Sequence, residues 1–174
     1  LLFEDNASAY LTGLIAGRMT ETNKVGFIGG MESPVISKFD YGFRAGVKAA
    51  NPDAEVMVQY ANSFTDSALG KTIANQMHSK NADIIFTCAG AVGIGAIEAA
   101  KENGKNAIGV DQDQNALAPD NVITSAMKNI DVAVVELLSK VVDGSYKGGE
   151  VIINTLAMNG VGIPQSSEKN VPPD

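Results

Sequence analysis

Cysteine, histidine and tryptophan are nearly missing from this sequence. Its 174 residues include one cysteine, Cys88, one histidine, His78, and no tryptophan. A single thiol cannot form a disulfide within the chain, and its apolar neighbours favour a buried, unreactive side chain. The single imidazole has no zinc-ligand spacing around it and no recognisable Ser-His-Asp or Cys-His arrangement. We therefore expect a solvated histidine, no enzymatic activity and no cofactor.

Positive charge is also scarce. Lysine and arginine number 13 against 20 aspartates and glutamates, which gives a net charge of −7. No basic stripe is present, so nucleic acid is not an expected partner. No apolar run approaches the roughly 20 residues of a membrane-spanning helix. The apolar content of 45% instead indicates a folded domain with a sizeable core.

Short apolar runs alternate with amphipathic segments between Lys24 and Asp113. The runs cover residues 25–30, 56–60, 83–89 and 106–111, and helical spacing of apolar residues covers 35–50, 66–80 and 91–103. This alternation predicts an α/β fold with a doubly wound parallel sheet. We expect the four strands in the order 2-1-3-4, with the first strand central and the switch point between the first and the third.

Two apolar helices flank this unit and predict parts of a second, incomplete lobe. The first covers residues 7–20, and the second, at 130–142, is apolar on most sides. Large side chains form one face of the first helix: Tyr10, Leu11, Leu14, Ile15 and Met19. Because such faces are too apolar to leave in water, we expect the two helices to pack on each other or on a second copy of the chain. Residues 122–126 and 151–156 are further strand candidates, and 165–174 is expected to be a polar tail.

The loops that follow the four strands should meet at one edge of the sheet, where ligands bind in such folds. Gly90 opens a helix directly after a strand, so this turn either offers backbone N–H groups to a polar ligand or is only a tight connection. Asp111 ends the fourth strand and either accepts hydrogen bonds from ligand hydroxyls or caps the next turn. Lys128, after the fifth strand candidate, either reaches the same cleft or is a solvated strand end.

Two aromatic residues and two motif-like stretches need separate interpretation. Phe39 has the spacing of a core residue, whereas Phe64 lies unusually in a polar loop. Residues 90–95 reverse the glycine spacing of a dinucleotide-binding loop, so such a site is not expected. Residues 111–122 begin like a calcium-binding loop but lack its glycine and its final glutamate, so no metal site is expected.

Several stretches spread over nearly the whole chain carry a family resemblance. They are YLTGLIAG at 10–17, KVGFIGGM at 24–31, SFTD at 63–66, ADIIF at 82–86 and GVDQDQ at 109–114. Together they resemble the basic membrane protein family, which holds substrate-binding lipoproteins of ABC transporters, including purine nucleoside receptors. The resemblance implies a type I periplasmic-binding-protein fold, with two α/β lobes, three crossing segments and a ligand closed between the lobes.

The resemblance also implies a division of the chain. Residues 1–23 would be a remnant of the N-terminal lobe, whose first part lies outside this chain, and 24–128 the C-terminal ligand-binding lobe. Residues 129–145 would be a helix of the other lobe, and 146–174 the final strand, crossing segment and tail. Carried over to this sequence, Phe39 would stack on a base and Asp111 would hold ribose hydroxyls, while Gly90 and Lys128 would line the cleft.

The function implied by the resemblance is that of a purine nucleoside receptor. It would serve an ABC importer as a membrane-anchored, extracytoplasmic lipoprotein and deliver its ligand to the permease and ATPase. The alternatives are a ligand-sensing regulatory domain of the same fold, as in repressors and competence regulators, and a sugar receptor.

Overall fold

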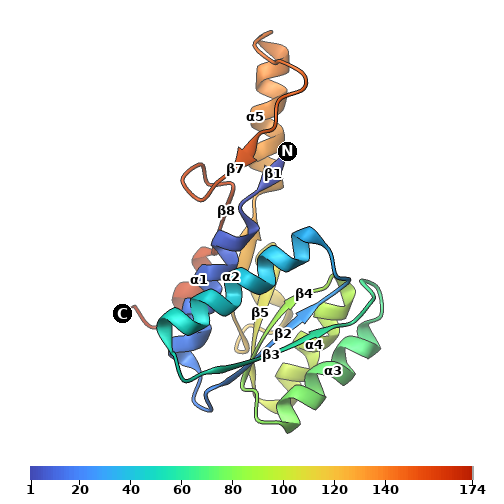
Figure 1. The fold of residues 1–174 in the computed structure, drawn as a ribbon, viewed down its shortest axis with the longest axis vertical. Helices are drawn as coiled ribbons and strands as arrows, with labels where there is room; N and C mark the ends of the chain where they lie inside the picture. Colours follow the sequence, from blue (N-terminus) through green and yellow to red (C-terminus); the bar gives the residue numbers. More distant parts are fainter. Residues whose placement is uncertain (174) are drawn as a thin grey trace.

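Six strands form the central sheet of the computed structural model, which describes residues 1–173. They are β2 (Lys24–Gly29), β3 (Glu55–Tyr60), β4 (Ile84–Cys88), β5 (Asn106–Asp111), β6 (Val122–Lys128) and β8 (Val161–Gly162). Their order is β3-β2-β4-β5-β6-β8, and every neighbouring pair is parallel except β6 and β8. The four strands that the sequence predicts between residues 24 and 113 therefore lie in the predicted order, 2-1-3-4. This order confirms the doubly wound lobe (Figure 1).

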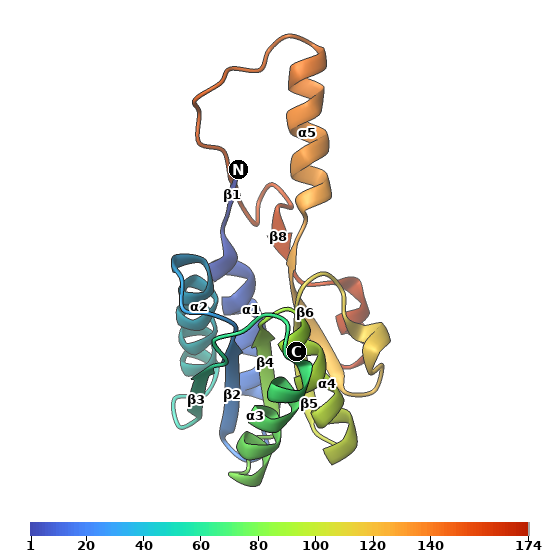
Figure 2. The ribbon, with the colours of Figure 1, turned by 90° about the vertical axis from the view of Figure 1, so that its right-hand side faces the viewer.

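Helices cover both faces of this sheet (Figure 2). Helices α1 (Asp5–Met19) and α2 (Pro34–Ala50) lie on one face, and α3 (Ser67–Ser79) and α4 (Ala91–Asn103) lie on the other. Successive strand residues point to opposite faces, so Phe27 joins the core under α1 and α2 while Ile28 joins the core under α3 and α4. Burial on both faces explains why the central strands β2 and β4 are nearly continuous apolar runs, whereas the edge strand β3 is partly exposed.

Small residues, not large ones, form the buried face of α1. Glycines of the two helices face each other's backbone: a Cβ at Gly13 would overlap the carbonyl of Phe43, and one at Gly46 would overlap the carbonyl of Tyr10. The larger side chains of α1, among them Tyr10, remain partly or largely exposed. The expected contact between residues 7–20 and 130–142 is thus wrong, because α1 packs against α2, β6 and β8 instead.

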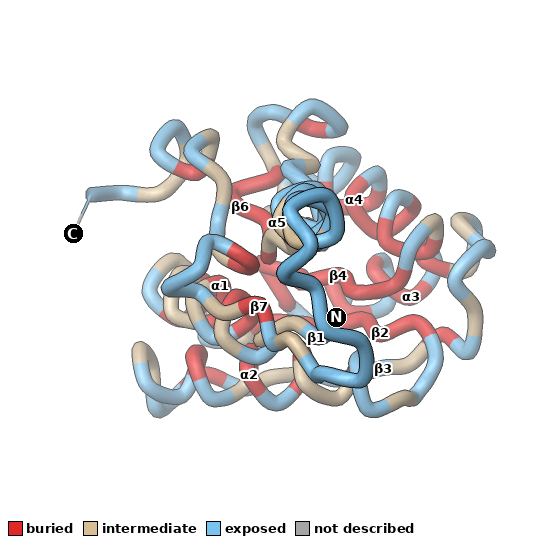
Figure 3. The backbone as a smooth tube through the Cα atoms, turned by 90° about the horizontal axis from the view of Figure 1, so that it is seen from above, coloured by how far each residue is buried: buried red, intermediate tan, exposed pale blue. Residues whose placement is uncertain are grey.

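An arm extends beyond the carboxyl ends of the strands (Figures 1 and 2). It contains α5 (Ile130–Val142) and two short parallel strands, β1 (Leu2–Phe3) and β7 (Ile153–Asn154). The strand expected over 151–156 is therefore only two residues long. Most of α5 is exposed, including Val135 and Leu138, and Ala133 is its one buried residue (Figure 3).

Three chain segments connect the lobe to the arm and are tied to one another. The backbone N–H of Asn129 donates to the carbonyl of Gly160 at 2.9 Å, and the Asn129 side chain donates to the carbonyl of Asn159. The Glu4 carboxylate accepts from the N–H of Leu156. The division of the chain into two lobes stays a prediction, but the packing of α1 argues for a boundary before Asp5 rather than at residue 23.

The C-terminal segment packs on the lobe and is not a free tail up to residue 173. A short 3-10 helix, η2 (Gln165–Lys169), brings Ser167 to within 2.8 Å of the Thr124 hydroxyl in a buried hydrogen bond, and Val171 packs against the core. A second 3-10 helix, η1 (Asn115–Leu117), follows β5. Among the helices of residues 1–173, none combines the length and apolarity needed to cross a membrane.

His78 also lies elsewhere than predicted. It was expected at the surface, but its ring is buried near the end of α3, where Nδ1 lies 2.9 Å from the carbonyl of Ala82. The buried Nε2 has no hydrogen-bond partner among the described residues. The imidazole therefore supports the turn into β4 and has no catalytic partner.

Candidate functional site

The loops at the carboxyl ends of the strands meet at one edge, as expected. The backbone N–H of Gly30, after β2, donates to the carbonyl of Cys88 at the end of β4. The N–H of Ala91, at the start of α4, donates to the carbonyl of Phe64, in the loop after β3, at 2.8 Å. These two bonds join three loops that are far apart in the sequence, so Gly30 and Gly90 are neighbours at the switch point.

Gly90 forms a tight turn between β4 and α4. Its φ of +58° is a conformation that side-chain-bearing residues rarely adopt, and a Cβ there would come within 2.8 Å of the Phe64 carbonyl. The turn places the N-terminus of α4, which favours polar or negative ligand groups, at the edge. The tight connection is confirmed, and a contact between this turn and a ligand stays a prediction.

Asp111 presents an exposed carboxylate at this edge. It has a φ of +66°, which aspartate tolerates better than most residues, and its side chain is 59% exposed. Among residues 1–173, no group donates a hydrogen bond to this carboxylate, and Asp113 instead caps the following turn by accepting from the N–H of Asn115. The capping alternative therefore does not apply to Asp111.

The loop behind Asp111 is held by Gln114. Its side-chain oxygen accepts from the N–H of Val110 at 2.9 Å, and its own N–H donates to the Ser125 hydroxyl. These contacts hold the backbone on both sides of Asp111, so the end of β5 has a defined position at the edge.

Lys128 is not a solvated strand end. Its side chain is only 15% exposed, and its Nζ lies 2.9 Å from Oδ1 of Asp5 and 4.0 Å from Oδ1 of Asp111. The ammonium also lies over the rings of Phe3 and Phe39, at 5.6 and 5.3 Å from their centroids. Lys128 therefore faces the same edge as Asp111, with a buried carboxylate as its first partner.

Asp5 was missed by sequence reasoning. It lies at the start of α1 and its side chain is 4% exposed, so its charge depends on the contact with Lys128. The sequence around residue 5 shows only an acidic residue in the first turn of a helix. Such a residue usually indicates no more than a favourable interaction with the helix dipole. Its approach to the end of β6 depends on the crossing of the chain between arm and lobe.

Phe39 and Phe64 differ in their exposure at the edge. Phe39 is 1% exposed and packs edge-on against Phe86, so it has no free face on which a base could stack. Phe64 is 40% exposed at the edge, and its ring lies directly against Gly30, where any Cβ would overlap it. The structure therefore does not support stacking on Phe39, and Phe64 is the exposed ring beside Gly90.

The electrostatic environment of the edge acts on two side chains. Burial by the surrounding protein raises the pKa of Asp111, the nearby Lys128 ammonium opposes this rise, and the Asp5 charge adds to it. Burial also raises the pKa of the Cys88 thiol well above its usual value, and the Asp111 charge acts in the same direction. Cys88 is thus an inert, neutral part of the floor beneath the carboxylate.

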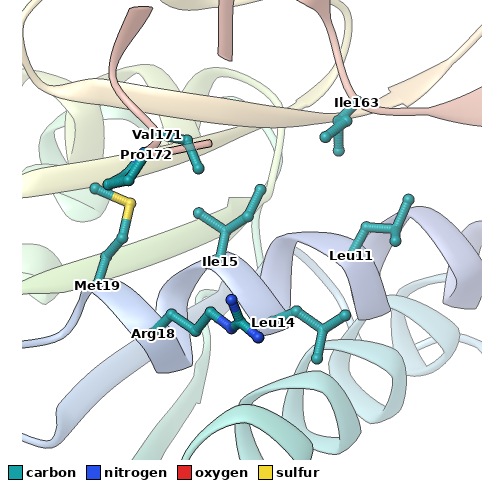
Figure 4. Close-up of a pocket in the computed structure, with 8 residues that line it drawn as sticks. All are labelled: Leu11, Leu14, Ile15, Arg18, Met19, Ile163, Val171 and Pro172. Atoms are coloured by element: carbon teal, nitrogen blue, oxygen red, sulfur yellow. The ribbon is translucent and has the colours of Figure 1, made fainter. Parts of the chain in front are cut away.

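An apolar groove of about 580 Å³ lies elsewhere, on the flank of the lobe (Figure 4). Residues of α1 and of the C-terminal segment line it: Leu11, Leu14, Ile15, Arg18, Met19, Ile163, Val171 and Pro172. It lacks the convergent polar groups that fix a hydrogen-bonding ligand, so the edge of the sheet remains the candidate site. Within residues 1–173, no three His, Cys, Asp or Glu side chains converge to hold a metal ion.

Two curated proteins share much of this sequence. Basic membrane protein B of Borreliella burgdorferi is 41% identical in an alignment of 172 positions that covers 97% of this chain and 50% of that protein. The ABC transporter nucleoside-binding protein BmpA of Lactococcus lactis is 41% identical in an alignment of 178 positions that covers 92% of this chain and 51% of that protein. The chain spans about half the length of these curated relatives.

A solved structure and a family profile complete the comparison. The crystal structure of a solute-binding protein of an ABC transporter system from Aeropyrum pernix superposes with a TM-score of 0.87 at 31% identity, covering 94% of this chain and 49% of that one. The profile of the Bmp family, described as ABC transporter substrate-binding protein PnrA-like, matches residues 1–172. The chain therefore belongs to the Bmp family of ABC transporter substrate-binding proteins.

Proposed function

We propose that this chain forms the greater part of one lobe of a receptor that captures a purine nucleoside for an ABC importer. The observation that carries the proposal is the exposed carboxylate of Asp111 at an edge that also holds an exposed aromatic ring, Phe64. A sugar needs hydrogen-bond acceptors for its hydroxyls, and a base needs an aromatic face. The printed name of the Lactococcus relative, a nucleoside-binding protein, supports the same ligand class.

Each site residue has a defined part in this proposal. Asp111 accepts hydrogen bonds from the ribose hydroxyls, and the ring of Phe64 stacks on the base. Gly90 allows the ligand to approach the start of α4 closely, because it carries no side chain. Lys128 lines the cleft on the side of the arm. Binding changes no covalent bond of the ligand, so the receptor is not an enzyme.

The exposed arm supports the second half of the proposal, a two-lobed receptor. Val135, Leu138 and Val142 on α5 are exposed, as are Val151 and Ile153 near β7. Surface of this kind usually has a partner. We propose that the arm belongs to the other lobe and that the rest of that lobe covers it, so that the ligand is enclosed between the two lobes. The complete receptor would be an extracytoplasmic, membrane-anchored lipoprotein that delivers its ligand to the permease and ATPase.

A sensor or a sugar receptor of the same fold would use the same edge. The stacking surface of Phe64 favours a ligand with a base over a sugar alone, and the transporter relatives favour import over regulation. These alternatives therefore rank below the nucleoside receptor.

Calorimetric titration of the complete gene product with inosine and hypoxanthine tests the proposal. Asp111→Asn keeps the positive φ, which asparagine tolerates, and replaces charged hydrogen bonds by weaker neutral ones. We expect it to lower inosine affinity by about tenfold or more and to reduce the preference over hypoxanthine. Asp113→Asn, at the neighbouring turn cap, serves as the matched control.

Phe64→Ala should weaken inosine and hypoxanthine alike. Loss of one stacking contact corresponds to about 1–3 kcal/mol, or roughly 5- to 150-fold in affinity. A wild-type protein that binds neither ligand, or an Asp111→Asn variant with the wild-type preference for inosine, would contradict the proposed function.

A further inference from the structure

Three charged side chains meet where the arm joins the lobe. Asp5 comes from the start of α1, Asp111 from the end of β5, and Lys128 from the end of β6. The ammonium of Lys128 is 2.9 Å from the Asp5 carboxylate but 4.0 Å from the Asp111 carboxylate. The buried acid is thus its close partner, and the exposed acid is left free.

We propose that Asp5 is a positioning and specificity residue that holds the Lys128 ammonium away from Asp111. The edge then presents a free carboxylate and no free cation, so it selects an uncharged, hydroxyl-bearing ligand over the phosphorylated form of that ligand. The inference rests on the proposed nucleoside site and adds to it a reason for rejecting the corresponding monophosphate.

The environment of Lys128 keeps it on the Asp5 side. The rings of Phe3 and Phe39 lie beside its ammonium and limit its movement toward solvent. Asp5 lies in the first turn of a 15-residue helix, where the helix dipole favours a negative charge. Because Asp5 is almost fully buried, its contact with Lys128 is little screened by water or salt.

Asp5 also has bonding capacity that the protein leaves unused. Its Oδ1 makes no hydrogen bond of acceptable geometry within the described residues, although it lies at ion-pair distance from Lys128. Burial of a carboxylate oxygen without a hydrogen bond lowers the stability of the fold. A residue with a purely structural role would not need to carry this cost. A role in setting the charge of the site accounts for it.

The other charged groups near the edge do not offset this arrangement. Lys38, from α2, donates to the carbonyl of Phe3 at 3.5 Å and is engaged there. Glu32, Asp66 and Asp113 lie in loops after the strands, are exposed and add negative charge. A phosphate at the edge would therefore meet carboxylates, whereas a neutral ribose would meet a good acceptor.

Removal of the Asp5 charge should reverse the preference of the site for the nucleoside over its monophosphate. In Asp5→Asn the Lys128 ammonium loses its close partner, and Asp111 is the next carboxylate within reach. An ammonium bound to Asp111 would compete with ribose hydroxyls for that carboxylate and would offer a positive charge to a phosphate. Affinity for the nucleoside should fall while affinity for its monophosphate rises.

The test is a titration of the complete gene product with inosine and with inosine 5′-monophosphate. We expect the wild type to prefer inosine, and Asp5→Asn to shift the ratio of the two affinities toward the monophosphate by about tenfold or more. Asp5→Glu should keep the wild-type preference, and so should Glu32→Gln, which removes a carboxylate from the same edge without a contact to Lys128. NMR titration of the Asp111 carboxyl should show a lower pKa in Asp5→Asn.

A charge-neutral double variant decides the case if Asp5→Asn does not fold. Asp5→Asn with Lys128→Gln has no unpaired buried charge, and no cation remains in it, so it should not bind the monophosphate more tightly than the wild type does, whatever its affinity for inosine. The inference is overturned by a wild type that binds the monophosphate as tightly as inosine, by an unchanged ratio in Asp5→Asn, or by a double variant that binds the monophosphate more tightly than the wild type. If the wild type binds neither compound, the proposed function fails, and the Asp111 titration alone then decides whether Asp5 positions Lys128.

Discussion

The backbone of Gly30 lies directly against the ring of Phe64, so that any side chain at residue 30 would overlap the ring. Gly30→Ala should therefore push an exposed, movable ring away from its position at the edge. We expect the free energy of unfolding to change by less than about 1 kcal/mol, because Phe64 can swing into solvent. Affinity for the nucleoside, measured by calorimetry, should fall by about tenfold.

A double variant provides the control for this relationship. If Gly30 acts only through Phe64, then Gly30→Ala should have no further effect on affinity in a Phe64→Ala background. Additive losses in the double variant would show that residue 30 contacts the ligand itself.

The close packing of α1 on α2 reverses the usual effect of a helical glycine. Replacing glycine by alanine inside a helix normally stabilises it by roughly 0.5–1 kcal/mol. At Gly46, however, the added Cβ would overlap the carbonyl of Tyr10, which is backbone and cannot rotate away. Gly46→Ala should lower the free energy of unfolding by about 1–3 kcal/mol in urea titrations. Gly148→Ala, in open space, should not, and equal effects of the two would contradict the packing argument.

His78 should make stability depend on pH in the weakly acidic range. Burial lowers its pKa below the usual value of 6.5, which outweighs the opposing effect of the hydrogen bond to Ala82. The unfolded chain therefore takes up the proton first as the pH falls, and the folded state loses stability below about pH 6.5. His78→Asn should flatten the change in urea midpoint between pH 7.5 and 5.5. A slope equal to that of the wild type would exclude His78 as its source.

The exposed helix α5 should control association of residues 1–174 expressed alone. Val135 and Leu138 are exposed on a helix that makes few contacts with the lobe, so this chain should self-associate at high concentration. Val135→Lys with Leu138→Lys should make it monomeric in light scattering and change the unfolding free energy by less than about 0.5 kcal/mol. Ala133→Lys, at a buried position, should destabilise instead. A wild-type chain that stays monomeric would contradict the prediction.

The central part of the fold was predictable because local and tertiary preferences agree there. A strand such as β4 is apolar except for Thr87, short, and followed by Gly90 at the start of a helix, and a parallel sheet buried on both faces accommodates such runs in alternation. The position of Asp111 at the edge followed from the same reasoning, because the carboxyl end of a parallel strand is set by the chain direction.

The remaining parts depend on contacts that local patterns do not contain. In α1 the large side chains suggested the buried face, whereas close backbone approach at Gly13 selected the small ones. Helical spacing correctly indicated that Phe39 is a core residue, whereas its stacking role was carried over from the resemblance and stays a prediction that its burial does not support. Asp5 reaches Lys128 only because the chain crosses between arm and lobe, and no pattern near residue 5 reports that crossing.

The late position of β8 and η2 in the sequence has a consequence for synthesis on the ribosome. Strand β6 pairs with β8 at Met127 and Lys128, and its Thr124 hydroxyl is bonded to Ser167 of η2. Because translation proceeds from the N-terminus, β6 emerges from the ribosome before either partner does. During that interval the nascent lobe has an open strand edge, which is the kind of surface on which chains aggregate. A chaperone that shields this edge would therefore be needed only until the segment through Val171 has emerged.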